Sequence, residues 1–194
     1  MTGSSSTADE VSRLFREGGH SQYGHEAVTQ LEHALQAAWF AERAASSPAL
    51  IAASLMHDIG HLLHSLPDDA PERGIDDHHE TLAARWLKSR FGADVVEPVR
   101  LHVAAKRFLC ATEPSYLEQL SPPSVLSLKL QGGPMSAVEA NAFRANPHFE
   151  AAVALRRWDD EAKIPNLVTP PLDHFIAHVE QAARNSNPSI EERG

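Results

Sequence analysis

The segment His57-Asp58-Ile59-Gly60-His61 places a histidine beside an aspartate inside an otherwise apolar stretch. An ionised aspartate in such surroundings is costly unless a nearby charge compensates it. A divalent or trivalent metal ion does so, and it also favours neutral histidine as a ligand. Gly60 costs a helix about 1 kcal/mol, which indicates that the backbone bends there or admits a ligand closely. His61 lies one turn after His57, on the same helix face.

Helices are predicted to position these residues. Apolar residues recur with a helical period in several stretches, and Ser47-Pro48 is typical of a helix start. The stretch that follows is apolar nearly all round, which predicts a central, buried helix. The expected helices cover residues 25–45, 49–66, 78–91, 94–110, 146–162 and 169–184, with a short piece at 116–120 and another helix opened by the capping box 136–139.

Segments rich in turn residues separate these helices. Residues 67–77 are expected to form a polar loop, and residues 111–134 a less regular connection. No stretch alternates as a β-strand does. We therefore predict an all-α helical bundle that forms a single domain over residues 20–184, with a flexible N-terminal segment at 1–19 and a loose tail at 185–194.

Composition narrows the class of protein. The chain has 194 residues, a net charge of −9 and 42% hydrophobic residues, so one domain with a real core is expected. The acidic balance argues against nucleic acid or an anionic membrane as a partner, and no apolar run is long enough for a membrane span. A single cysteine and no signal peptide favour a cytoplasmic location. Twelve histidines exceed what a core needs.

Four of the candidate residues occur in a recognisable order. His33, the doublet His57-Asp58 and the distant Asp159 resemble the H…HD…D signature of HD-domain metalloproteins. Those proteins are all-helical, and the resemblance implies that the four residues bind a metal. The expected fold is therefore an HD-domain helical bundle.

Two further histidines, His79 and His102, raise the number of candidate ligands to six. Six ligands are too many for one metal that keeps an open position. Asp58 could bridge two ions, with His33 and Asp159 completing one side and the two further histidines the other. Two metals about 3.5–4 Å apart form a standard reactive unit, and nitrogen and carboxylate ligands without thiolate suit iron or manganese.

Longer strings point to one branch of that superfamily. The chain resembles the HD-domain mixed-valence di-iron oxygenases that degrade organophosphonates, in the strings QLEHALQAA, LMHDIGH, HHETLAARWL, HVAAKRFL, YLEQLS, LQGGPM and LRRWDDEAK. The resemblance covers residues 23–163. It implies two iron ions as an Fe(II)/Fe(III) pair, dioxygen as co-substrate, and oxidative cleavage of the C–P bond of an α-hydroxyphosphonate to a carboxylate and phosphate.

Several cationic and polar residues suit the phosphonate group. Lys106 lies one turn after His102 on the same helix face, where it could hold a phosphonate oxygen as a point charge, while His61 and Arg156 donate hydrogen bonds to the others. The resemblance implies that Ser124 also contacts the phosphonate. With Asp58, His61 and Lys106 are the expected catalytic residues.

Three more residues are expected around the substrate. Gln131, before two glycines, could close the same pocket. Glu26 precedes His33 by seven residues, so both should share a helix face, and its carboxylate could accept hydrogen bonds from a substrate ammonium. The resemblance makes Tyr23 a lid residue that can occupy the iron site when substrate is absent.

The substrate's nitrogen group is open between two forms. One is the trimethylammonium of (1R)-1-hydroxy-2-(trimethylammonio)ethylphosphonate, which gives glycine betaine. The other is the primary amine of (1R)-2-amino-1-hydroxyethylphosphonate, which gives glycine. We favour the trimethylated compound because an acidic loop with Asp76 and Asp77 precedes His79 and suits a fixed cation. An upstream phosphonate hydroxylase is expected by analogy with the family, without required physical contact.

Two other functions are weighed against the oxygenase. An HD phosphohydrolase would use the same His33/His57/Asp58/Asp159 set with a metal-bound hydroxide. A non-catalytic HD module would be expected to have lost ligands, and this chain keeps them. The other histidines are expected to have no role in the site; they are His20, His25, His64, His78, His148, His174 and His178.

Overall fold

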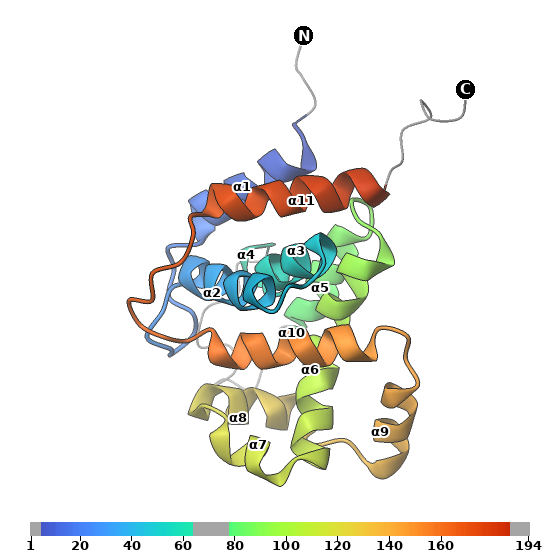
Figure 1. Ribbon diagram of the computed structural model, residues 1–194. Helices are drawn as coiled ribbons and strands as arrows, with labels where there is room; N and C mark the ends of the chain where they lie inside the picture. Colours follow the sequence, from blue (N-terminus) through green and yellow to red (C-terminus); the bar gives the residue numbers. More distant parts are fainter. Residues whose placement is uncertain (1–4, 64–77, 187–194) are drawn as a thin grey trace, which may run out of the picture.

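Two helices occupy the middle of the molecule in the computed structural model, which describes residues 5–63 and 78–186. They are α2 (Gln30–Arg43) and α3 (Pro48–Met56), and they pack against each other (Figure 1). Thr29 starts α2 with a reciprocal capping box to Glu32. Ser47 caps α3, which is buried along nearly its whole length. The predicted central helix is therefore present, although it ends at Met56 and not near residue 66.

The helix is interrupted at the segment that carries His57 and Asp58. His57 ends α3, residues 57–59 form a turn, and the four-residue α4 (Gly60–Leu63) follows. The predicted loop at 67–77, with Asp76 and Asp77, lies outside the described residues, as does His64. The described chain resumes at His78 and enters α5 (His79–Leu87).

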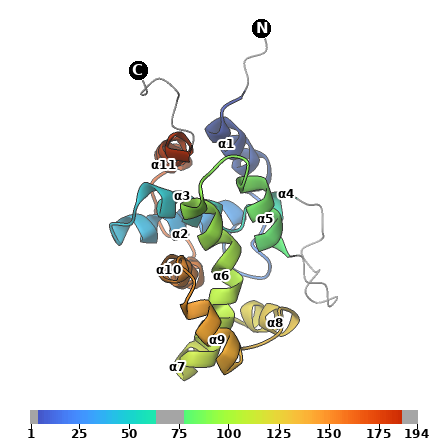
Figure 2. The ribbon, with the colours of Figure 1, turned by 90° about the vertical axis from the view of Figure 1, so that its right-hand side faces the viewer.

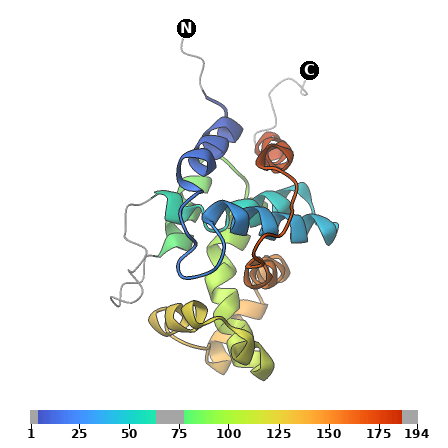
Figure 3. The ribbon, with the colours of Figure 1, turned by 90° about the vertical axis from the view of Figure 1, so that its left-hand side faces the viewer.

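The two ends of the described chain lie together on one side of the molecule. Helix α1 (Thr7–Gly18) packs beside α11 (Leu172–Ser186), as Figures 1 and 3 show. Val11 and Phe15 are buried in the main hydrophobic core with Phe175. The expectation of a flexible segment at 1–19 is therefore wrong for α1. Its capping box, in which Ser6 and Asp9 bond reciprocally, was the signal that we overlooked.

A second core lies at the other end of the molecule. The long α6 (Ala93–Thr112) packs against α10 (Phe149–Glu161) and extends to the group formed by three short helices (Figure 2). These are α7 (Pro114–Gln119), α8 (Pro122–Leu130) and α9 (Ala137–Arg144). Phe108, Leu109 and Phe143 belong to this core. The short helical piece expected at 116–120 is present as α7, but the irregular connection expected after it is wrong, because Pro122 starts α8.

The all-α prediction is confirmed, and the described chain forms a single domain. Among the described residues the nearest approach to a strand is one isolated bridge, between Gln22 and Thr29. That bridge belongs to a turn before α2, so the predicted helix start near residue 25 is wrong by several residues. Within the described ranges, no helix combines the length and the apolar character that crossing a bilayer requires.

Gly60 permits a close contact between α4 and α5. A Cβ atom built on Gly60 would lie 2.1 Å from the backbone oxygen of His79 and 2.8 Å from its carbonyl carbon. Backbone atoms cannot yield as a flexible side chain does. The glycine is therefore explained by the close approach of the segment that carries His79.

The Gly60→Ala variant should consequently displace the start of α5. We expect a loss of about 1–3 kcal/mol in the free energy of unfolding and a lower metal content in protein loaded under identical conditions. Chemical denaturation and metal analysis measure both effects. Gly18→Ala is the matched control, since its Cβ would meet only the side chain of Leu62, at 3.2 Å. Equal metal content in the two variants would contradict the explanation.

Candidate metal centre

Three buried histidines are oriented by backbone carbonyls. In each, ring nitrogen Nδ1 lies at hydrogen-bond distance from a carbonyl oxygen; the pairs are His33–Ala162 (2.8 Å), His57–Ser54 (2.8 Å) and His102–Val99 (2.7 Å). A carbonyl oxygen only accepts, so Nδ1 donates its proton, and in the neutral ring the lone pair then lies on Nε2. This arrangement is typical of histidines that bind a metal through Nε2.

These Nε2 atoms face one another. Nε2 of His33 lies 3.0 Å from Nε2 of His57, and Nε2 of His79 lies 3.2 Å from that of His102. Two lone pairs cannot hydrogen-bond to each other, so the first pair calls for a positive charge beside it. A metal ion supplies that charge and uses both lone pairs.

Asp58 lies between the two histidine pairs. Its Oδ2 is 3.4 Å from Nε2 of His57 and 3.6 Å from that of His33. Its Oδ1 is 3.3 Å from Nε2 of His79 and 3.5 Å from that of His102. Oδ1 is buried and has no hydrogen-bond partner among the described residues. The two carboxylate oxygens thus face two different sets of potential ligands.

Asp159 completes the first set. Its Oδ1 lies 3.4 Å from Nε2 of His33 and 3.7 Å from that of His57, and no described residue hydrogen-bonds to this oxygen. Its Oδ2 pairs with Nη1 of Arg156 at 2.7 Å. His33, His57, Asp58 and Asp159 offer ligand atoms within 4.8 Å of one another. The structure therefore brings together the residues of the H…HD…D pattern.

The electrostatics of this cluster favour a bound cation. Burial opposes ionisation of Asp58, but His57 and His33 hold the pKa of its carboxyl well below its usual range. Burial likewise opposes ionisation of Asp159, which Arg156 and His33 keep ionised, with a lowered pKa. Although burial opposes it, the nearby carboxylates of Asp159 and Asp58 raise the pKa of His33 to about 9. The carboxylates thus attract positive charge to the place where a metal would lie.

The second set is less negative. Burial lowers the pKa of His102 to about 3, so its ring stays neutral, which is the form that binds metals. His61 stacks on His79 with ring centroids 4.3 Å apart, and its Nε2 lies 4.0 Å from Oδ2 of Asp58. With a side chain 25% exposed, His61 lies at the edge of the cluster. Asp58, His61 and His79 also offer ligand atoms within 4.8 Å of one another, so Asp58 belongs to both sets.

Tyr23 and Glu26 come from the turn before α2. The ring of Tyr23 stacks on His33 at 3.8 Å. Burial and the carboxylates Asp58 and Asp159 raise the pKa of its phenol well above the usual value. The expectation that Glu26 and His33 share a helix face is wrong, because α2 begins only at Gln30.

The polar residues expected around a phosphonate lie on α6 and α8. Lys106 is 3% exposed, and its Nζ donates to Oγ of Ser127 at 2.8 Å. Burial, reinforced by Arg156, lowers the pKa of Lys106 to about 7. Ser124 is buried near the start of α8 and not in an irregular loop. Gln131 follows α8, and its buried Oε1 has no hydrogen-bond partner among the described residues.

Arg156 is engaged by carboxylates. Besides Asp159, it binds Asp160 through Nε and Nη2, and its Nε also donates to the hydroxyl of Tyr116 at 3.1 Å. Although burial opposes it, these carboxylates raise the pKa of the guanidinium well above its usual value. These contacts hold Asp159 in place; direct binding of phosphonate by Arg156 stays a prediction.

The sequence analysis missed Lys163, which lies directly after the end of α10. Its Nζ is 3.2 Å from Oε1 of Glu26 and 3.1 Å from Oγ of Ser124. Oε1 of Glu26 also accepts from Oγ of Ser121, at 2.6 Å. The string LRRWDDEAK ends at Lys163. The spacing of Lys163 in the sequence did not indicate a contact with Glu26, which lies near the other end of the chain.

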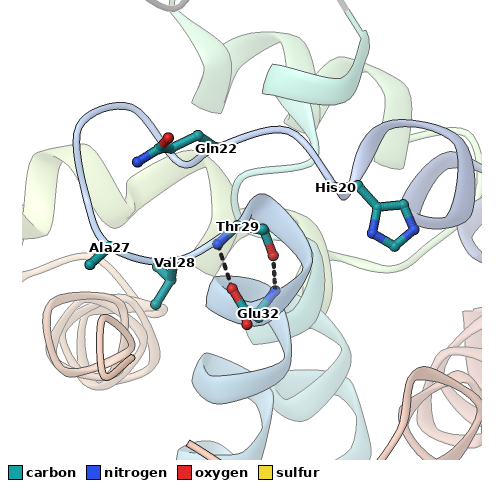
Figure 4. A pocket seen from close by; sticks show the side chains of 6 residues that line it. All are labelled: His20, Gln22, Ala27, Val28, Thr29 and Glu32. Carbon is teal, nitrogen blue, oxygen red and sulfur yellow. Dashed lines mark hydrogen bonds between the residues drawn. The ribbon is translucent and has the colours of Figure 1, made fainter. Parts of the chain in front are cut away.

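Several other histidines have different surroundings. Nε2 of His174 and of His178 contact Oε1 of Glu42, at 2.7 and 3.2 Å, which joins α11 to α2. His78 precedes α5 in a left-handed conformation, with a φ of 48°. His20 lines a surface hollow with Gln22, Ala27, Val28, Thr29 and Glu32 (Figure 4). This hollow contains none of the predicted site residues.

Comparison with known proteins identifies the fold family. Residues 31–131 match the HD domain. The chain belongs to the HD-domain family. It is 44% identical to a hydroxymethylphosphonate dioxygenase of Gimesia maris, over 89% of this chain and 86% of that protein. It is 39% identical to the glycine-betaine-forming [1-hydroxy-2-(trimethylamino)ethyl]phosphonate dioxygenase of Leisingera caerulea, over 88% of this chain and 87% of that protein.

These relatives confirm the predicted resemblance and the enzyme class. Both are dioxygenases, so this HD-domain chain is an oxidoreductase with a buried metal-binding cluster of histidine and aspartate. The name of the Gimesia maris relative specifies hydroxymethylphosphonate, a compound without a nitrogen group. The two compounds weighed from the sequence both carry a nitrogen group.

Removal of metal should destabilise the protein, because the cluster binds the ion only when folded. We expect a chelator to lower the melting temperature of metal-loaded protein by roughly 5–15 °C. His57→Ala should abolish this difference, because it removes a lone pair from the centre of the first set. His20→Ala should retain it, and thermal melts with and without chelator measure both. An equal loss in the two variants would exclude His57 as a ligand.

Proposed function

We propose that this enzyme is a di-iron dioxygenase that cleaves the C–P bond of a small α-hydroxyphosphonate. The observation that carries the proposal is the position of Asp58, whose two oxygens face two separate sets of histidines. In this proposal His33, His57 and Asp159 would hold one iron, His79 and His102 would hold the other, and Asp58 would serve both. An Fe(II)/Fe(III) pair with nitrogen and oxygen ligands would supply the activation of dioxygen and the redox chemistry.

The protein's own residues would bind and orient the phosphonate. Lys106 is buried, and its Nζ donates to the neutral hydroxyl of Ser127. Among the described residues no carboxylate forms an ion pair with it. A phosphonate oxygen is a suitable partner for such a charge. Ser124 and His61 would donate further hydrogen bonds to the phosphonate. Tyr23, stacked on His33, covers the first set and would have to move when substrate binds.

The reaction balances with dioxygen alone. The C–P bond and a C–H bond at C1 break, and C1 is oxidised from an alcohol carbon to a carboxylate. Phosphorus leaves as inorganic phosphate, and both oxygen atoms of dioxygen are retained in the products. The oxidation of C1 supplies all the electrons that reduction of one dioxygen requires, so no further reductant is consumed.

Three compounds are candidate substrates. The trimethylammonio compound stays our sequence-based prediction, with the amino compound as its alternative, and the Gimesia maris relative adds hydroxymethylphosphonate. A cytoplasmic location and an upstream phosphonate hydroxylase likewise stay proposals.

Metal content and oxygen uptake test this proposal. Iron-loaded protein should hold about two irons per chain, and it should consume oxygen and release phosphate from at least one of the three compounds. His33→Ala and His102→Ala should each reduce the iron content to about one and stop phosphate release, while His174→Ala should do neither. Hydrolysis of phosphate esters without oxygen, by protein holding one ion, would instead identify an HD phosphohydrolase.

Lys106 should give the reaction a characteristic pH dependence. Its pKa is lowered to about 7, so the side chain is cationic below that pH and loses its charge as the pH rises. We expect kcat/KM to fall up to tenfold per pH unit above pH 7, because this quantity reports the free enzyme. Lys106→Met should lack this decline and raise KM by about 10–100-fold.

The exposed Lys129 on α8 offers a matched control for the Lys106 variant. Lys129→Met should keep both the wild-type KM and the decline above pH 7. An unchanged decline in Lys106→Met would assign it to another group.

A further inference from the structure

Lys163 lies where the substrate's nitrogen group is expected. Its Nζ is 3.2 Å from Oε1 of Glu26 and 3.1 Å from Oγ of Ser124, and it lies 5.9 Å from the centre of the Tyr23 ring. Both charged side chains are largely buried, with 13% and 16% of their surface exposed. Glu26, the one residue proposed to receive a substrate ammonium, thus already has an ammonium group beside it.

The backbone around Lys163 is fixed to α2 on both sides. Nδ1 of His33 donates to the carbonyl oxygen of Ala162 at 2.8 Å. The side-chain amide of Gln36 donates to the carbonyl oxygen of Ile164 at 2.9 Å and accepts from its N–H at 3.0 Å. His33 and Gln36 are fully buried. The position of Lys163 is therefore set by three hydrogen bonds to the same helix that carries a proposed metal ligand.

The charged side chains around Lys163 have partners of opposite charge when no substrate is bound. Glu26 and Lys163 neutralise each other. Asp160 balances Arg156, and the second carboxylate on Arg156, Asp159, belongs to the proposed metal cluster. A substrate that brought a second cation to Glu26 would place two like charges close together in a poorly hydrated space, which is unfavourable. A substrate without a cation leaves the Glu26–Lys163 pair intact.

We propose that Lys163 makes this enzyme selective for α-hydroxyphosphonates without a positively charged group, of which hydroxymethylphosphonate is the smallest. This inference rests on the proposed function and reverses our sequence-based preference for the trimethylammonio compound. With hydroxymethylphosphonate and dioxygen the products are formate and phosphate, which account for every atom and for the electrons taken from the carbon. Lys163 is thus a specificity-determining residue.

Competition between three substrates tests the selectivity. Iron-loaded wild-type protein is assayed for phosphate release from hydroxymethylphosphonate, 2-amino-1-hydroxyethylphosphonate and its trimethylammonio analogue. We expect kcat/KM to be at least about tenfold higher for the compound without a cation, since repulsion of about 1.4 kcal/mol gives that factor. Lys163→Met should raise kcat/KM for both cationic compounds about tenfold, because it frees Glu26.

Three further variants connect the effect to charge. Lys163→Arg keeps the cation and should keep the wild-type preference. The double variant Lys163→Met/Glu26→Gln should lose the gain seen with Lys163→Met alone. Lys129→Met, on the exposed side of α8, should behave as wild type. Iron content and circular dichroism establish that each variant is folded, and if Lys163→Met is not, the wild-type and Lys163→Arg preferences still decide.

The outcomes separate the two proposals. A wild-type preference for either cationic compound, or no gain for them in folded Lys163→Met, would overturn the role of Lys163 while leaving the dioxygenase intact. Absence of oxygen-dependent phosphate release from all three compounds would overturn the proposed function itself.

Discussion

The structure is organised around one buried carboxylate, Asp58, whose two oxygens face different histidines. Asp58 is 7% exposed, and its oxygens face His33 and His57 on one side and His79 and His102 on the other. An ionised group in such a place is destabilising unless positive charge surrounds it. The histidines on both sides offer nitrogen ligands, so a metal ion bound in the cluster would supply that charge.

The fold meets this constraint by bringing candidate ligands from five separate segments to one place. Helix α2 carries His33, the turn after α3 carries His57 and Asp58, and α5, α6 and α10 carry the others. The break after α3 matters for this, because Gly60 allows the backbone of His79 to approach closely. A side chain at that position would separate the second ligand set from Asp58.

Three cationic side chains near the cluster differ in their partners, and each has a different role in the proposal. Arg156 is tied to Asp159 and Asp160 and positions a ligand carboxylate. Lys106 has no recorded carboxylate partner among the described residues and is suited to an anionic substrate group. Lys163 pairs with Glu26 and removes the negative charge that a cationic substrate would need. Substrate choice in this proposal therefore follows from which charges the protein already compensates.

The sequence by itself determined the helical class, the H…HD…D residues and the two added histidines, because helical periodicity and residue order are local properties of the chain. It also indicated that the backbone at Gly60 has a special role. Tertiary structure alone decided that Asp58 faces two sets of histidines and that Lys163 contacts Glu26. These depend on distances between segments far apart in sequence, such as the 3.2 Å between Nζ of Lys163 and Oε1 of Glu26, and no periodicity or motif encodes such a distance.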